Sequence, residues 1–274
     1  MKKLLLLFFI LLSGINSFAQ CPTTVITLTT QAEVDDFAVT YPGCTAISDG
    51  LIVSGSDINN LLGLSGITQI TGGFSISNNP LLENLNGLEN LISITISGSF
   101  TIRDNALLSS ISALSSLSGP VGYSLEIINN PSLQSLNGLQ NVTSPGDDDL
   151  HIENNDMLTN LNGLESMTSA DDVVIWGNDA LTSLTGLSNF ELTGELLIWD
   201  NDVLETLDGL SSLDTIFSLS LKDNLVLNDI SELTDITIEL DHIFEVTNNP
   251  NLSNCSIESV CFRLANNQGT IIFK

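Results

Sequence analysis

The chain has 274 residues, and its 33 acidic residues outnumber six Lys and Arg residues to give a formal net charge of −27. Such an acidic surface repels nucleic acid and anionic lipid, so neither is expected as a partner. Hydrophobic residues make up 42% of the chain, which is too many for intrinsic disorder.

Residues 1–19 have the pattern of a secretory signal peptide. Lys2 and Lys3 precede an apolar run from Leu4 to Leu12, and a cleavage point follows Ala19. This run is too short to span a bilayer, and we expect no transmembrane segment in the mature chain. The protein is therefore predicted to be secreted or exposed at the cell surface.

Residues 20–50 are predicted to form an N-terminal cap that contains a short strand and a short helix. Thr30 and Glu33 have the spacing of a capping box. Cysteines of exported proteins point to disulfides, and a Cys21–Cys44 bond would pin the helix over the first coil. The residues with helical spacing on the apolar face are Val34, Phe37, Ala38 and Tyr41.

Residues 51–254 contain a repeat that is marked by one asparagine, counted below as position zero. Gly55 occupies the same slot one coil earlier. The repeating residues are Asn79, Asn105, Asn130, Asn155, Asn178, Asn201, Asn224 and Asn249. Spacings of 23 to 26 residues predict a solenoid, in which stacked coils share one core.

Each coil combines two apolar patterns. Positions −5 and −3 are apolar with a polar residue between them in most coils, as in a half-buried strand. Positions +3, +6, +9 and +12 are apolar every third residue, which suits 3₁₀-like turns better than an α-helix. We therefore predict an all-β, right-handed β-solenoid of about nine coils, with one parallel strand per coil and capped ends.

The asparagine follows the strand, where the chain turns sharply. We expect its amide to satisfy buried backbone groups of the turn and to form a ladder with the asparagines of neighbouring coils. Glycine at position +8 in six coils is predicted to supply a positive-φ corner, although Ala113 and Glu232 fill this position elsewhere.

Residues 255–274 are predicted to form a C-terminal cap, which we expect to be truncated. A Cys255–Cys261 bond is difficult if both residues share one helix, because about 9 Å would separate them. Either Cys255 precedes the helix, or one cysteine lacks its partner because the chain is a fragment.

The pattern resembles the bacterial receptor L-domain-like proteins, a leucine-rich family of single-stranded β-helices whose architecture animal growth-factor and insulin-type receptors share. The resemblance covers residues 21–274 and implies fold more specifically than function. The matching segments are Tyr41-Pro42-Gly43-Cys44, Leu51-Ile52-Val53-Ser54-Gly55, Ile76-Ser77-Asn78-Asn79-Pro80-Leu81-Leu82, Leu85-Asn86-Gly87-Leu88 and Cys255-Ser256-Ile257-Glu258-Ser259-Val260-Cys261.

No catalytic residues are predicted. The two histidines, His151 and His242, belong to no recognisable nucleophile or metalloprotease motif. Polysaccharide lyases also use β-solenoids, but their sites need basic residues clustered with acids. This chain has few basic residues, so a polysaccharide-active enzyme is the alternative that we do not favour.

The outward strand face carries the candidate ligand-binding site. Positions −4 and −2 would bring both tryptophans of the chain together with apolar and charged neighbours. The predicted site residues are Trp176, Trp199, Val174, Leu197, His151, Glu153 and Lys222. Exposed aromatic residues with a polar rim favour a sugar ring or a protein hot spot, and the alternative is an aromatic pair that only stabilises the sheet.

An acidic turn is the second candidate. Asp156, Asp179 and Asp202 share position +1, and acids also recur at position −1. Bound Ca²⁺ could relieve their repulsion, but we favour a solvated acidic edge and predict no other cofactor or metal.

Together these features predict a non-enzymatic recognition or adhesion module that binds an extracellular protein or glycan through its strand face. A purely structural spacer is the third alternative.

Overall fold

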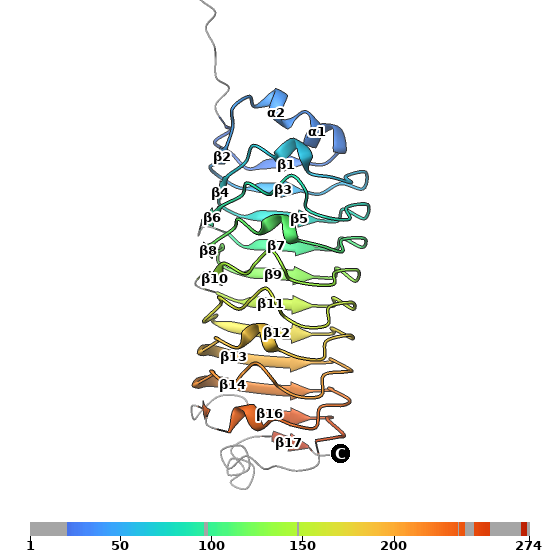
Figure 1. Ribbon diagram of the computed structural model, residues 1–274, viewed down its shortest axis with the longest axis vertical. Helices are drawn as coiled ribbons and strands as arrows, with labels where there is room; N and C mark the ends of the chain where they lie inside the picture. Colours follow the sequence, from blue (N-terminus) through green and yellow to red (C-terminus); the bar gives the residue numbers. More distant parts are fainter. Residues whose placement is uncertain are drawn as a thin grey trace, which may run out of the picture.

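The computed structural model describes residues 21–95, 98–146, 148–234, 236–238, 244–252 and 270–272. Successive coils stack in a single column, with helices α1 and α2 at one end and strand β17 at the other (Figure 1). This arrangement confirms the predicted all-β solenoid of about nine coils. The predictions for residues 1–19, His242, Cys255 and Cys261 lie outside the described residues.

The main sheet has 12 strands, and every pairing in it is parallel. Each strand pairs with the strand one coil away, so that Ile152 lies opposite Ile175 and Ile175 opposite Ile198. In sheet order the strands are β1 (Ile26–Leu28), β3 (Leu51–Val53), β5 (Phe74–Ser77), β7 (Phe100–Arg103), β9 (Leu125–Ile128), β11 (Leu150–Glu153), β12 (Asp172–Trp176), β13 (Leu192–Trp199), β14 (Thr215–Lys222), β16 (Phe244–Thr247) and β17 (Thr270–Ile272), while β15 (Thr237–Ile238) pairs with β14.

Several coils also contain a second short strand, so the prediction of one strand per coil is wrong. These strands form a three-stranded sheet of β2 (Ala46–Ile47), β4 (Gln69–Thr71) and β6 (Ser93–Thr95), and a pair of β8 (Gly119–Pro120) and β10 (Val142–Ser144). They add an inward row that the sequence analysis missed, in which Ile47, Ile70 and Ile94 are at most 1% exposed. One apolar residue in each strand is too short a pattern to detect in sequence.

Two of the 23-residue coils have one long strand in place of the two short ones. The coil between Asn105 and Asn130 has 25 residues and contains both β8 and β9. The coils that end at Asn201 and Asn224 have 23 residues each, and each contains one strand of eight residues, β13 or β14. With fewer residues available to form a corner, the chain continues as one strand from the place of the second short strand into the main sheet.

The turns repeat every three residues, as the apolar spacing predicted. The N–H of Leu82 bonds the carbonyl of Asn79 at 3.1 Å, and the same three-residue step joins Leu88 to Leu85 and Leu91 to Leu88. Four coils form a short 3₁₀-helix at these steps. The four helices are η1 (Leu62–Leu64), η2 (Ser112–Leu114), η3 (Thr185–Leu187) and η4 (Ser231–Leu233).

Position +8 takes two conformations, so the predicted positive-φ corner is right in four coils and wrong in two. Gly87 has a positive φ of 114°, and the glycines that follow Asn137, Asn162 and Asp208 also have positive φ values. Gly186 instead lies in η3, where an added Cβ would sit 1.7 Å from the carbonyl oxygen of Leu161. An Asn or Asp before the glycine distinguishes the positive-φ corner from the 3₁₀ form.

The predicted core residues are buried throughout the described chain. Around the ladder asparagines, the residues at positions −5, −3, +3, +6, +9 and +12 from Phe74 to Ile236, together with Val246 and Leu252, are at most 5% exposed. Because neighbouring coils cover both sides of each layer, these side chains form one continuous apolar cluster along the column.

The N-terminal cap contains two short helices, α1 (Gln31–Asp35) and α2 (Phe37–Thr40). Thr30 and Glu33 form the predicted capping box. The chain breaks its helical path at Asp36, so the predicted apolar face is not continuous. Val34 and Phe37 are buried, whereas Ala38 is exposed, which contradicts its predicted place on that face.

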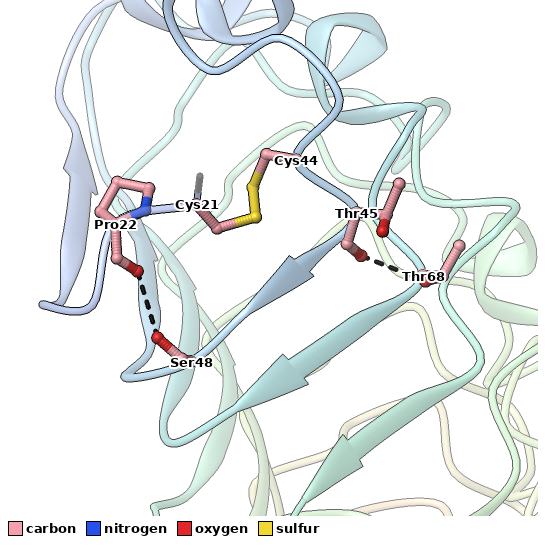
Figure 2. Close-up of a disulfide and its surroundings, with 6 residues drawn as sticks. All are labelled: Cys21, Pro22, Cys44, Thr45, Ser48 and Thr68. Carbon is pink, nitrogen blue, oxygen red and sulfur yellow. Dashed lines mark hydrogen bonds between the residues drawn. A yellow bond between two sulfur atoms is a disulfide. The ribbon is translucent and has the colours of Figure 1, made fainter. Parts of the chain in front are cut away.

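A disulfide between Cys21 and Cys44 ties the segment before β1 to the end of the helical cap (Figure 2). Beside it, the Ser48 hydroxyl donates to the carbonyl of Pro22, and the Thr68 hydroxyl donates to the carbonyl of Thr45, both at 3.1 Å. The covalent bond and these hydrogen bonds fix the cap over the first coil.

Candidate binding surface

Strands β11 to β14 bring the predicted ligand-binding residues onto one face. Because side chains alternate across a strand, positions −4 and −2 point away from the core. In the sheet register, His151 pairs with Val174 and Val174 with Leu197, forming one row. The parallel row consists of Glu153, Trp176, Trp199 and Lys222.

The two tryptophans lie in register on adjacent strands, but they differ in their surroundings. Trp176 is 40% exposed. Trp199 is half-buried, its Nε1 donates to the Ser220 hydroxyl at 2.9 Å, and the Lys222 ammonium lies 5.8 Å from its ring centroid. Within the described chain the two indoles make no ring-to-ring contact with each other, so the surface is not a self-stacked pair.

His151 lies half-buried between two carboxylates. Its Nδ1 is 2.9 Å from Oε1 of Glu153, and its Nε2 is 3.6 Å from Oδ2 of Asp149. The hydrogen bond to Glu153 raises the pKa of His151, and the charges of Glu153, Asp149 and Glu126 act in the same direction against the effect of burial. At a given pH, His151 is therefore protonated to a greater extent than an unperturbed histidine side chain.

Asp149 is a residue of this face that the sequence analysis missed. Burial raises the pKa of its carboxyl, and the charges of Asp148 and Asp172 add to the effect. Its Oδ1 accepts the N–H of Asp172 at 3.2 Å, and Oδ1 of Asp172 accepts the N–H of Glu195 at 2.9 Å. The spacing of 149, 151 and 153 by two residues was the signal, since such residues share a strand face.

The asparagines at position zero form a hydrogen-bonded ladder along the column. All eight are buried, and none is more than 7% exposed. Oδ1 of Asn178 accepts both the N–H and the Nδ2 of Asn155, and Nδ2 of Asn178 donates to the carbonyl of Ile152. Gly55 enters the ladder by donating its N–H to Oδ1 of Asn79.

The acidic turn has a conformational explanation. The residue before each ladder asparagine has a positive φ, for example 57° at Asp104 and Asp200 and 65° at Gly177. Asn, Asp and Gly tolerate this left-handed conformation best, which accounts for the acids at position −1. At position +1, Asp156, Asp179 and Asp202 occupy the second residue of a turn.

Calcium remains a prediction without support from this geometry. Among the described residues, no group of three or more His, Cys, Asp or Glu side chains is placed to hold a metal ion.

In the same part of the chain, no helix is long and apolar enough to cross a membrane.

The chain folds as a β-solenoid with ordered aromatic and polar side chains on the outer face of β11 to β14. Residues 43–113 match the family model of the receptor L domain, which is a non-catalytic binding domain. The match covers the end of the cap and the first coils, and the Trp residues lie in later coils of the same column. A sequence search of curated proteins gave no match.

Proposed function

We propose that the protein is a non-enzymatic recognition module, secreted or held at the cell surface, that binds an extracellular protein or glycan through the strand face of β11 to β14. The surface comprises Trp176, Trp199, Val174, Leu197, His151, Glu153 and Lys222, and is called the Trp patch below.

One observation carries this proposal: the exposed apolar surface is held in place before any ligand binds. The hydrogen bond from Trp199 to Ser220 and the nearby Lys222 orient one indole. The bond between His151 and Glu153 orients the polar rim. Side chains that are already ordered lose little conformational entropy on binding, which favours affinity. The disulfide and the receptor L domain match support an extracellular setting.

The test is a screen of the purified protein against arrays of glycans and of purified extracellular proteins, with a hydrolysis assay on any glycan that binds. We expect saturable binding without product release. The Trp176→Ala/Trp199→Ala variant should weaken that binding by about tenfold or more, as loss of aromatic anchors does. Tyr123→Ala removes an aromatic that is 45% exposed elsewhere on the surface, and it should bind like the wild type.

Product release would identify an enzyme instead. Equal binding by the Trp double variant and the wild type would place the ligand on another surface. Absence of binding to any array component would favour a structural spacer.

A further inference from the structure

A second exposed surface lies at the turn that follows each ladder asparagine. In these turns the N–H at position +3 bonds the carbonyl of the asparagine, as Leu158 bonds Asn155 at 2.9 Å and Leu181 bonds Asn178 at 3.0 Å. Positions +1 and +2 are therefore the two corner residues and project into solvent. Such corners usually carry Pro, Gly, Asn, Asp or Ser, and proline does occupy position +1 at Pro80 and Pro131.

Apolar side chains occupy many of these corners instead. Leu81, Leu107, Met157 and Val203 at position +2 are 47%, 46%, 51% and 38% exposed, and Leu225 at position +1 is 50% exposed. Ala180 continues the row, and Ser132 interrupts it. We call the six residues Leu81, Leu107, Met157, Ala180, Val203 and Leu225 the turn ridge.

The turn ridge is a row rather than a set of scattered side chains. The last four members come from four successive coils, and coils stack about 4.8 Å apart, so this run extends for about 15 Å. Turn conformation does not require apolar residues here, since aspartate and proline fill equivalent corners elsewhere. An exposed apolar row of this kind commonly marks an interaction surface.

Carboxylates lie beside three members of the turn ridge. Asp156, Asp179 and Asp202 precede three of its members directly in the chain. On the same edge, a groove of about 490 Å³ is lined by Asp104, Ala106, Asn129, Pro131, Asn154 and Asp156. The acids and the groove thus lie beside apolar side chains.

Asp156, Asp179 and Asp202 form no ion pair with a Lys or Arg side chain among the described residues. The two basic side chains in that part of the protein are Arg103, which pairs with Asp104 at 3.4 Å, and Lys222, which lies over the Trp199 ring. A second copy of the protein would bring like charges together at this edge, at a formal net charge of −27 per chain. Charge complementarity therefore selects a cationic partner.

We propose that the turn ridge docks a cationic amphipathic peptide segment. Apolar side chains of that segment would cover the turn ridge, and its Lys or Arg side chains would pair with Asp156, Asp179 and Asp202. This surface is separate from the Trp patch, which lies on the strand face before the ladder asparagine.

The probe is a synthetic Lys/Leu peptide whose leucines lie on one face of a helix, measured by fluorescence anisotropy at low salt and at high salt. Two control peptides separate the contributions: a scrambled peptide of the same composition, and a peptide with Glu in place of Lys. We expect the amphipathic Lys/Leu peptide to bind at least about tenfold more tightly than either control, and more weakly at high salt.

Matched variants locate the site. Met157→Ser/Val203→Ser/Leu225→Ser removes three apolar side chains from the turn ridge, and we expect about tenfold weaker binding. Leu62→Ser/Ile92→Ser/Leu192→Ser is the control, because these residues are 60%, 54% and 49% exposed outside the turn ridge. The changed positions are all at the surface, and melting curves of the variants verify that the fold is kept.

A further variant tests the charges and the independence of the two surfaces. Asp156→Asn/Asp179→Asn/Asp202→Asn should weaken peptide binding and reduce its salt dependence, whereas Trp176→Ala/Trp199→Ala should leave it unchanged. The proposal is overturned if the turn-ridge variant binds the peptide within about twofold of wild type. The proposal is also overturned if the scrambled peptide binds as tightly as the amphipathic peptide. It is overturned as well if the wild type forms a dimer that the turn-ridge variant does not form.

Discussion

The backbone N–H of Asn155 donates to Oδ1 of Asn178 at 3.1 Å, one coil further along the column. The same Oδ1 accepts Nδ2 of Asn155, while Oδ1 of Asn155 accepts the N–H of Asn130 at 3.2 Å. Each asparagine thus bonds the coils on both sides, and the ladder couples the stability of one turn to that of the next.

Asn155→Ala should lower the free energy of unfolding by about 2–4 kcal/mol, because it leaves the buried N–H of Asn130 without its acceptor and opens a small cavity. Equilibrium urea unfolding followed by circular dichroism measures the change. Gln134→Ala, at an exposed position in the same coil, is the control and should change stability little. A loss no greater than that of Gln134→Ala would show that the ladder contributes nothing to stability.

Asp200→Val should destabilise the protein by about 1–2 kcal/mol, since the residue has a φ of 57° and a β-branched side chain disfavours this conformation. Asp200→Gly should be neutral or stabilising, because Gly177 fills the equivalent position with a φ of 65°. Thermal melting distinguishes the two variants. Asp214 does not have a positive φ, so Asp214→Val is the matched control. Equal destabilisation by Asp200→Val and Asp214→Val would contradict the explanation.

Reduction of the Cys21–Cys44 bond should cost about 3 kcal/mol, because the disulfide closes a chain segment with a sequence separation of 23. The effect is measured by melting the protein with and without a reducing agent. Cys21→Ser/Cys44→Ser should melt like the reduced protein and should not respond to reductant. If wild type and the double variant melt at the same temperature in oxidising buffer, the bond does not stabilise the cap.

The imidazole of His151 should titrate above its ordinary pKa of about 6.5, because Glu153 and Asp149 favour its charged form. A raised pKa in the folded state means that the linked stability is fully present below the unfolded-state pKa. This stability disappears as the pH rises through the folded-state value. The melting temperature of His151→Gln should therefore fall below that of wild type at pH 5, and the two should converge at pH 9.

NMR titration of the His151 ring gives the pKa directly. Glu153→Gln removes the partner at 2.9 Å and should bring the value down toward the ordinary one. Burial, together with the charges of Asp148 and Asp172, also raises the pKa of the Asp149 carboxyl. An unshifted His151 in wild type would show that the two carboxylates do not act on it.

The sequence by itself determined the column, its inward rows and the slot of each ladder asparagine. These features recur in every coil, and burial of Leu82 or Ile175 is dictated by the period alone. The register that places Trp176 beside Trp199 follows from the same repeat. The Asn-Gly pairs at the corners also carried a usable signal, which distinguishes Gly87 from Gly186.

Only the tertiary structure decided the features that depend on contacts between coils. The second short strands and the exposed turn ridge depend on how neighbouring coils cover one another. The pattern within one coil cannot reveal them, because a single apolar residue looks the same in sequence whether an adjacent coil buries it or a turn corner exposes it.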